Sequence, residues 1–307
     1  MEAGPRIVIL GGTGVFGGLV AEELADLPLV IGSRNLERAR AAAAKLPRAE
    51  GRRIDLEGPL EFHDASVVVH CAGPYRGQDL RVVEACERAG AWYVDLADEK
   101  PYLDRVAGRP RVLAGMSSIP GLAVTLARAL GGGTARAFLY IGNRNAKGSA
   151  AFTTLLKGIQ RGGWSHREFV RFPFGLRAMH HFESPVPGME FKVGFELPAV
   201  NRLFSLAREL FRMGVPLPPA GPLLAGANLL SGPGTGMGCL LVETPRGRAW
   251  ALSTNRGQRM AAIPAALAAR LLHEGGSLRP LPDTFEPGEL FDALRRRDFE
   301  VVVELFP

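Results

Sequence analysis

The feature that most constrains this chain is a run of glycines directly after its first apolar segment. Residues 6–10 (RIVIL) have the continuous apolar character of a buried strand, and GGTGVFGG at 11–18 follows them and opens a helical pattern. Glycines in this setting permit a tight turn, a close backbone approach to a diphosphate and close packing of helix on strand. Free amides and the positive end of the helix dipole then bind the phosphates. The predicted binding loop consists of Gly11, Gly12, Thr13, Gly14, Val15, Phe16 and Gly17.

Short apolar runs and helical patterns alternate through the first 130 residues, which favours binding by the glycine loop over a simple turn. Further strands are expected at 27–32, 65–72, 91–96 and 111–115, and helices at 15–25, 36–46 and 79–90. The strands are continuously apolar, as in a parallel sheet that is covered on both faces. Regular succession of strand and helix gives right-handed crossovers. The expected fold class is therefore α/β, a Rossmann-type doubly wound parallel sheet.

A change of rhythm after residue 130 predicts a second domain, with longer, more polar strands and segments rich in Gly and Pro. We expect three parts: 1–130 as the dinucleotide-binding domain, 131–255 as an α+β substrate or dimerisation domain, and 256–307 as helices and a strand that pack back on the first domain. Residues 200–213 have the pattern of an amphipathic helix. The apolar stretch 214–236 contains five prolines and is not expected to form a spanning helix. The apolar face of the predicted helix consists of Leu203, Phe204, Ala207, Leu210 and Phe211.

The end of the second predicted strand, IGSRN, indicates which dinucleotide is bound. NAD-binding proteins usually place Asp or Glu here to accept hydrogen bonds from the ribose, but this chain has Ser33 and Arg34. A guanidinium that contacts a phosphate contributes roughly 1.5 to 3 kcal/mol, which is enough to favour NADP over NAD. Arg38 either shares in binding the 2′-phosphate or caps the adenine face, or it is a solvated helix residue. Asp55 either meets the adenine edge or caps a turn.

Several later segments resemble the saccharopine dehydrogenase-like family. VVVHCAGPY (67–75) has that family's strand-end AGPY, and VVEACERAGAWYVDLADE (82–99) has its helix ending in AC and AG and its YVDL strand followed by an acidic residue. RVLAGMSSIPGLAVTLA (111–127) is similar to the family's next strand and Pro-Gly helix. SGPGTGMGCLLVETPRG (231–247) is similar to the branch that contains trans-acting enoyl reductases. The resemblance implies an NADP-dependent oxidoreductase.

Candidate catalytic residues follow from the carboxyl edge of the predicted sheet, where ligands collect in this fold. Tyr75 offers an ionisable hydroxyl, with a tyrosine that packs on the second domain as the alternative. Asp95 and Glu99 flank the end of the YVDL strand, where either can orient the carboxamide or relay a proton. Capping of a helix is the alternative for Asp95. The loop expected to line the nicotinamide by close backbone approach consists of Ala72, Gly73 and Pro74.

Several classes of protein are disfavoured by what the sequence lacks. None of the four tyrosines is followed four residues later by lysine, so the proton relay of short-chain dehydrogenases is missing. The net charge of +6 comes from dispersed arginines without a long basic run, which argues against a nucleic-acid partner. Three cysteines without a CxxC pair predict neither a disulfide framework nor a metal site. We expect a cytoplasmic protein, because the strand at 6–10 leaves no room for a secretory signal.

The predicted function is that of an NADP-dependent oxidoreductase, a homodimer that acts on a C=N or C=C bond of a small-molecule substrate. Imine chemistry calls for arginines that bind carboxylates, and Arg76, Arg144 and Arg177 are available for it. Enoyl reduction calls for an apolar tunnel, which the segment from Leu203 to Leu230 can line as readily as it can form a core. One alternative is an NADP-responsive binding module without turnover. Another is a peripheral membrane protein whose helix at 200–213 lies on lipid.

Overall fold

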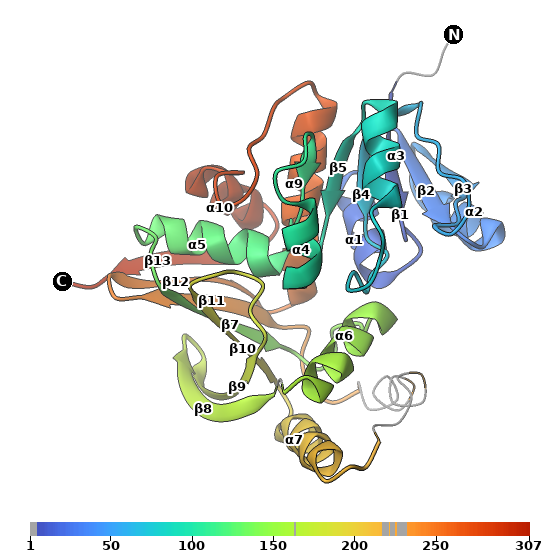
Figure 1. Ribbon diagram of the computed structural model, residues 1–307. Helices are drawn as coiled ribbons and strands as arrows, with labels where there is room; N and C mark the ends of the chain where they lie inside the picture. The colour runs from blue at the N-terminus through green and yellow to red at the C-terminus, as the bar shows by residue number, and fades with distance from the viewer. Residues whose placement is uncertain (1–4, 163, 217–220, 222–224, 226–231) are drawn as a thin grey trace. The chain divides into compact units, whose positions relative to one another are not determined.

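A computed structural model describes residues 5–162, 164–216, 221, 225 and 232–307 of the chain (Figure 1). The chain divides into two compact units. The first consists of Met1–Thr125 and Ala261–Ala293, and the second of Leu126–Met260 and Leu294–Pro307. Most of the proline-rich stretch at 214–236, including Leu230, lies outside the described residues.

The first unit contains a six-stranded sheet in the order β3-β2-β1-β4-β5-β6, and every adjacent pair of strands is parallel. This order and this parallel arrangement define a Rossmann-type doubly wound sheet, so the predicted fold class is confirmed. The apolar side chains of the central strands, such as Ile7, Val8 and Val68, are fully buried, as the continuous apolar runs predict. The strands are β1 (Arg6–Leu10), β2 (Leu29–Ser33), β3 (Ala49–Arg53), β4 (Ala65–His70), β5 (Trp92–Asp95) and β6 (Val112–Leu113).

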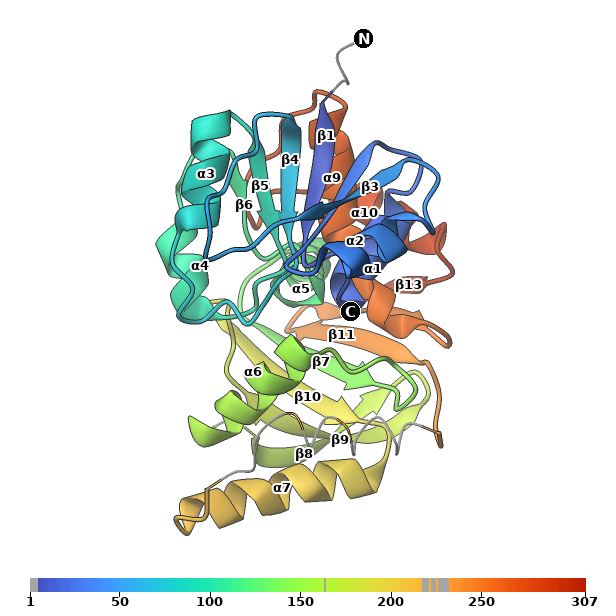
Figure 2. The ribbon, with the colours of Figure 1, turned by 90° about the vertical axis from the view of Figure 1, so that its right-hand side faces the viewer.

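Helices cover this sheet, and one of them comes from the far end of the sequence. Helix α9 (Ile263–His273) contacts β1, β4 and β5 and packs beside α1 (Val15–Glu23). Figure 2 shows β1, β4 and β5 side by side, with α9 behind β1. The inner face of α9 is made of alanines that are almost completely buried, which allows the helix to lie close to the strands. The other helices of this part are α2 (Leu36–Ala43), α3 (Arg81–Ala89), α4 (Lys100–Val106), the short helical segment Ser118–Leu122, and α10 (Pro287–Arg295), which ends in the second unit.

Two elements of the first unit were absent from the sequence prediction. Strand β3 is polar, and it forms because it pairs with β2 and because Gly51 lets the α2 backbone approach: a Cβ at Gly51 would lie 2.3 Å from the Arg40 nitrogen. Helix α4 is short and is anchored by Tyr102, whose buried hydroxyl lies 2.6 Å from that of Tyr93. Neither element has an apolar period of its own, so only contacts with distant residues reveal it.

The second unit contains a seven-stranded mixed sheet in the order β13-β12-β11-β7-β10-β9-β8. Strands β7 and β10 are parallel and the other neighbours are antiparallel. One face holds an aromatic core around Phe138, Tyr140 and Phe172. The strands are β7 (Ala135–Ile141), β8 (Ser165–Phe172), β9 (Gly175–Phe182), β10 (Met189–Phe195), β11 (Gly238–Thr244), β12 (Gly247–Ser253) and β13 (Glu300–Leu305). The helical segments are α5 (Ala123–Ala129), which begins in the first unit, α6 (Ser149–Gln160), α7 (Pro198–Arg212) and the short turn Gly257–Ala261.

The structure differs from the sequence prediction at two places after residue 200. Strand β13 pairs with β12 in the second sheet, whereas we expected the whole of 256–307 to pack on the first domain. The unpaired edge of β12 offers backbone hydrogen bonds that the sequence pattern could not reveal. In α7, Phe204 is buried but Leu203 is 57% exposed, so the predicted apolar face is wrong at Leu203.

Candidate functional site

The carboxyl ends of four parallel strands meet at one edge of the first sheet. The register pairs Leu10 of β1 with Gly32 of β2 and with His70 of β4, and it pairs His70 with Asp95 of β5. The segments that follow these residues therefore leave the sheet side by side. They contain the glycine loop, the Ser33–Arg34 pair, the loop at 71–76 and the acidic residues after β5. In a doubly wound sheet this edge is where ligands bind.

At two positions of the glycine loop, the surrounding space leaves no room for a side chain. Gly11 has a positive φ of 71°, and a Cβ there would lie 2.9 Å from the Cβ of Ala72 in the neighbouring loop. A Cβ on Gly17 would lie 2.3 Å from the carbonyl oxygen of Gly11, which brings α1 directly onto the turn. Gly14, in contrast, is exposed, and its Cβ position has a single neighbour, the Gly11 oxygen at 3.2 Å. The tight sides of the turn thus face the protein, and Gly14 faces outward.

The start of α1 is open to a ligand. Gly14 is the N-cap residue, and no side chain of the described residues caps the helix. The first amides of an uncapped helix, here those of Val15, Phe16 and Gly17, lack intrahelical partners, and the helix dipole places partial positive charge at them. Thr13 lies beside them, with its hydroxyl 3.4 Å from that of Ser33. The residues present therefore fit the diphosphate of a dinucleotide.

Two exposed arginines lie at the end of β2. Asn35 caps α2 by accepting a hydrogen bond from the Arg38 amide at 2.9 Å, and Ser33 accepts one from the Asn35 amide at 3.3 Å. These bonds fix the backbone that carries Arg34 and Arg38, and both side chains are exposed. Within the part of the chain that the structure describes, neither guanidinium is in an ion pair. Both are therefore available to a phosphate.

A third arginine at this position was missed by the sequence analysis. Arg53 is the register partner of Ser33 on the adjacent strand β3, so the two side chains leave the same face of the sheet. Arg53 is exposed. Its position follows only from the pairing of β3 with β2, which no periodicity announces. Asp55, two residues later, accepts a hydrogen bond from the Glu57 amide at 3.2 Å. This contact favours the turn-capping alternative for Asp55.

The loop formed by Ala72, Gly73 and Pro74 is held by Gln78, which in turn contacts the buried His70. The Gln78 amide nitrogen donates to the Ala72 and Pro74 carbonyls, both at 2.8 Å, which turns its Oε1 towards His70 Nε2 at 2.8 Å. Because Oε1 can only accept, Nε2 carries the proton of the His70 ring. Burial lowers the His70 pKa to about 4, so the ring is neutral at neutral pH. Sequence reasoning did not identify this pair, because its function is visible only in the contacts.

Glu99 holds the other end of the same loop. It is 4% exposed, and its Oε2 accepts hydrogen bonds from the amides of Tyr75 at 2.8 Å and Arg76 at 2.7 Å. The Arg76 Nε lies 3.6 Å from its second oxygen. A carboxylate that receives two backbone amides fixes those peptides in place. Glu99 is therefore brought together with the loop at 72–76, as its position after β5 suggested, but its carboxylate faces the backbone.

Asp95 ends β5 in a fully buried position. Its Oδ1 accepts hydrogen bonds from the amides of Gly115 at 2.7 Å and Ala97 at 2.9 Å, and its Oδ2 has no hydrogen-bond partner among the described residues. Burial raises the Asp95 pKa to about 6, although the two amides oppose this shift. The carboxyl group therefore ties β5 to the segment after β6, and it gains or loses its proton around pH 6.

Tyr75 does not present its hydroxyl at the surface of this edge. The side chain is 6% exposed, and the hydroxyl donates to the His70 carbonyl at 2.7 Å. Burial raises the pKa of Tyr75 well above its usual value, which disfavours loss of its proton. The ring packs against His70 and Tyr102, with centroids 5.3 and 5.4 Å away. These contacts favour a packing role, within the first unit itself.

The comparisons with known proteins agree with this geometry. Residues 7–111 match the family model of the saccharopine dehydrogenase NADP binding domain. The resemblance predicted from the AGPY and YVDL segments is confirmed over this region. The part of the first unit that carries the glycine loop is thus similar to the NADP-binding domain of saccharopine dehydrogenase, and this match supports NADP as the cofactor.

Curated relatives match about a third of the chain. The human saccharopine dehydrogenase-like oxidoreductase is 27% identical over 123 residues, and the rat protein of the same name is 26% identical over 123 residues. Each match covers 32% of this chain and 29% of the relative. The likeness to these oxidoreductases therefore spans less than a third of their length.

A solved structure extends the likeness in fold to the second unit. Apo saccharopine dehydrogenase (L-Glu forming) from Saccharomyces cerevisiae superposes with a TM-score of 0.62 and 13% sequence identity, covering 99% of this chain and 100% of that one. At this identity the match concerns the fold alone. Across the described residues, no helix is long and apolar enough to cross a bilayer.

Proposed function

We propose that this protein is an NADP-dependent oxidoreductase acting on a C=N or C=C bond of a small molecule. The observation that carries the proposal is the joint presence of an uncapped α1 behind a glycine turn and a group of exposed arginines at the end of the neighbouring strand. Amides and helix dipole suit a diphosphate, and guanidinium groups suit a 2′-phosphate. The matched NADP-binding domain supports the same assignment.

Most of the predicted cofactor contacts have a role in this proposal. Gly11, Gly12 and Gly17 shape the turn, Gly14 leaves room for the diphosphate, and the first amides of α1 bind it. Ser33, Arg34 and Arg38 form the 2′-phosphate pocket together with Arg53, the register partner of Ser33. The loop at 72–74 lies against Gly11 and lines the nicotinamide side. When NADP is bound, its nicotinamide supplies or accepts the hydride.

The three residues expected to be catalytic have contacts that support a different role. Tyr75, Asp95 and Glu99 are buried and hydrogen-bonded to backbone atoms of this edge. We assign them to positioning: Glu99 and Tyr75 hold the loop at 72–76, and Asp95 holds the end of β5. In this arrangement the proton that the reaction needs comes from the substrate, from solvent or from another part of the protein.

A titration of NADPH and NADH by fluorescence tests cofactor preference. For the full chain we expect tighter binding of NADPH. Arg34→Gln should weaken NADPH binding by roughly ten- to a hundredfold, the loss of a charge-assisted contact, and leave NADH nearly unchanged. Arg40→Gln is the matched control, since Arg40 is exposed on α2 and forms an ion pair with Glu37. Equal binding of the two dinucleotides, or equal effects of the two variants, would overturn the proposed pocket.

A binding module without turnover is the second candidate, and the burial of the expected catalytic residues favours it. The two candidates differ in NADPH consumption. Incubation with a panel of imines and enoyl thioesters, followed at the absorbance of NADPH, separates them. Oxidation that exceeds a Gly14→Asp control supports the enzyme. An unchanged signal across the panel, with NADPH bound, supports the module.

Exposed apolar side chains on α7 are the observation that favours a lipid-directed enoyl reductase. Leu203, Leu206 and Met213 are 57%, 55% and 70% exposed. Co-sedimentation with liposomes measures any such association. Leu203→Ser with Leu206→Ser should abolish it if this face touches lipid, and these two are better probes than Phe204, which is buried.

We further propose a homodimer located in the cytoplasm. Free thiols at all three cysteines, two of them buried, suit a reducing compartment. Light scattering on the purified full chain gives the oligomeric state, and a monomer at all concentrations would exclude the dimer.

A further inference from the structure

The second unit contains two adjoining cavities that the cofactor site does not use. They measure about 490 Å³ and about 280 Å³, and both lie between strands β8 and β9 and helix α7. Arg167, His180 and Ser205 line both cavities, so the two share this wall. The larger volume is within the range of pockets that hold small molecules.

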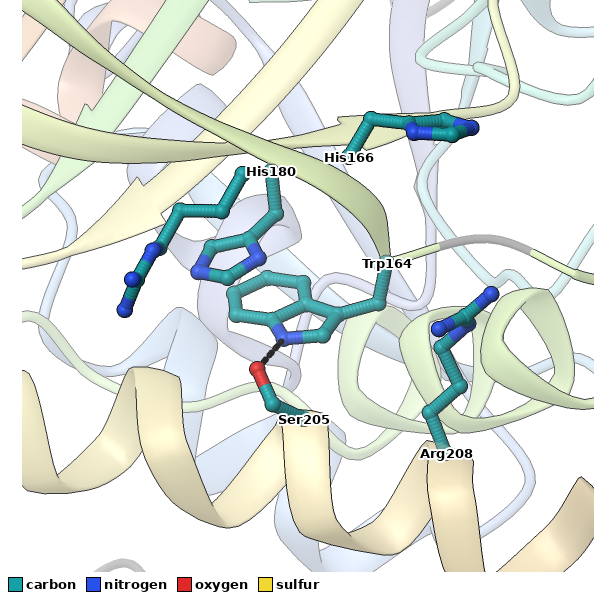
Figure 3. A pocket seen from close by; sticks show the side chains of 6 residues that line it. Trp164, His166, His180, Ser205 and Arg208 are labelled. Atoms are coloured by element: carbon teal, nitrogen blue, oxygen red, sulfur yellow. Dashed lines mark hydrogen bonds between the residues drawn. The ribbon is translucent and has the colours of Figure 1, made fainter.

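The wall between β9 and α7 is rigidly built. The His180 ring stacks on the Trp164 indole with centroids 4.2 Å apart and planes 10° apart (Figure 3). Trp164 Nε1 donates to Ser205 Oγ at 3.1 Å, and Ser205 Oγ donates to the Asn201 carbonyl at 3.0 Å. Asn201 in turn makes two hydrogen bonds with the backbone of Phe195. A wall fixed in this way is preorganised before any ligand arrives.

Positive charge dominates the larger cavity. Arg167, Arg177 and Arg202 line it, against one carboxylate, Glu196. The Glu196 Oε2 already accepts the amides of Asn143 at 2.8 Å and Thr235 at 2.7 Å. Within the described residues neither Arg167 nor Arg202 forms an ion pair. The cavity therefore offers uncompensated guanidinium groups.

One polar atom in this wall lacks a partner. His180 is 3% exposed, and its Nε2 forms no hydrogen bond with any described residue. A buried ring nitrogen without a partner is unfavourable, and such a group in a native structure calls for an explanation. Because His180 lines both cavities, a polar group of a ligand can supply the missing bond.

Apolar side chains line the same cavity. Phe169 is 65% exposed and Leu176 is 54% exposed, and both line it together with the Tyr140 ring. Arg167 lies over the Phe169 ring, 5.6 Å from its centroid. Exposed apolar side chains that adjoin one another in a groove can mark a ligand-binding site. The chemistry of the cavity is thus half cationic and half apolar.

We propose that this cavity of the second unit binds a small organic anion, with its carboxylate or phosphate on Arg167, Arg202 and His180 and its apolar body on Phe169 and Leu176. The site takes its ligand independently of NADP, because the residues that form it belong to the second unit alone. A planar body is favoured by the aromatic lining. Arg177 contributes its charge from a fixed position, since it donates to the Phe174 and Leu176 carbonyls.

Calorimetric titration of the full chain without NADP tests the proposal. The probes are benzoate, phenyl phosphate and the neutral isostere benzamide. We expect benzoate or phenyl phosphate to bind at least tenfold more tightly than benzamide. Whichever anion binds more tightly identifies the preferred group, carboxylate or phosphate. Comparable binding of benzamide and the better anion, or the absence of binding by either anion at millimolar concentrations, overturns the proposal.

Two matched pairs of variants locate the site. Arg167→Gln should weaken binding of the better anion roughly ten- to a hundredfold, whereas Arg171→Gln on the same strand should leave it within about twofold. Arg202→Gln and Arg212→Gln form the corresponding pair on α7. All four side chains are exposed, so folding should persist, and far-UV circular dichroism checks it. Equal effects within both pairs refute the site, and NADPH binding by the same variants should be unchanged in either case.

Discussion

Two adjacent glycines in α1 provide a sharp test of the glycine turn. Gly17 and Gly18 share the same helix, yet their surroundings differ completely. A Cβ on Gly17 would lie 2.3 Å from the Gly11 carbonyl oxygen and 2.8 Å from the Gly12 Cα, both backbone atoms. A Cβ on Gly18 would meet nothing within 4 Å. Gly17→Ala and Gly18→Ala therefore change helix propensity by the same amount, and the two variants differ only in the steric clash of the new Cβ.

The magnitudes follow from these distances. Alanine in place of glycine inside a helix contributes about 0.5 to 1 kcal/mol of stability, so Gly18→Ala should be stabilising by that amount. Gly17→Ala gains the same propensity, but its Cβ has to move by about 1.1 Å, from 2.3 Å to the 3.4 Å of ordinary contact, and backbone has to move with it. Overpacking of this kind costs about 1 to 3 kcal/mol. At roughly 2 to 4 °C per kcal/mol, the two variants should differ in Tm by roughly 2 to 12 °C.

Thermal unfolding followed by circular dichroism measures this difference, and a fluorescence titration with NADPH measures its consequence. Displacement of α1 moves the amides that bind the diphosphate, so Gly17→Ala should weaken NADPH binding at least about tenfold. Gly18→Ala should bind as the unmodified chain does. If the two variants unfold at the same temperature and bind NADPH equally, the close approach of α1 to the turn does not exist and the proposed diphosphate site fails with it.

Asp95→Asn should raise the free energy of unfolding at about pH 7.5, by up to about 3 kcal/mol, and change it little at about pH 4. Burial raises the Asp95 pKa from 3.8 to about 6, so the ionised carboxyl destabilises the folded state as the pH rises through this window. Urea titrations at both pH values measure the change in the free energy of unfolding. An effect of the substitution that does not depend on pH would contradict this reasoning. Gln78→Leu removes the hydrogen bonds to His70 and to two loop carbonyls, so it should lower the free energy of unfolding by about 1 to 3 kcal/mol and weaken NADPH binding. Unchanged NADPH binding would show that the loop at 72–74 does not contact the cofactor. Arg270→Gln breaks a half-exposed pair with Asp26 and should cost less than about 1 kcal/mol in low salt, an effect that a salt series should reduce.

The first sheet could be predicted in detail because its information is local. Strand β1 begins and ends where the apolar run RIVIL does, and the glycines that follow it need no distant partner to form a turn. The ends of β2, β4 and β5 came within a few residues of expectation for the same reason. The carboxyl edge, with Ser33, Arg34 and Asp95, then followed from the rule that parallel strands end together.

The elements that escaped prediction depend on contacts between distant residues. Strand β3 is polar and is held by β2 and by α2 above Gly51, so Arg53 could not be placed beside Ser33 in advance. The final strand joined the second sheet because β12 had an edge to pair with. Its apolar pattern is equally compatible with either sheet.

The sequence by itself determined the dinucleotide turn, the parallel sheet behind it and the likeness to the saccharopine dehydrogenase NADP-binding domain, because each depends on residues that are close in the chain. Tertiary structure alone decided which side chains are free to act. It buried the hydroxyl of Tyr75 and the carboxyl groups of Asp95 and Glu99, since their partners come from other strands and loops. It also gathered arginines from β8, β9 and α7 around one cavity, which no spacing in the sequence could have shown.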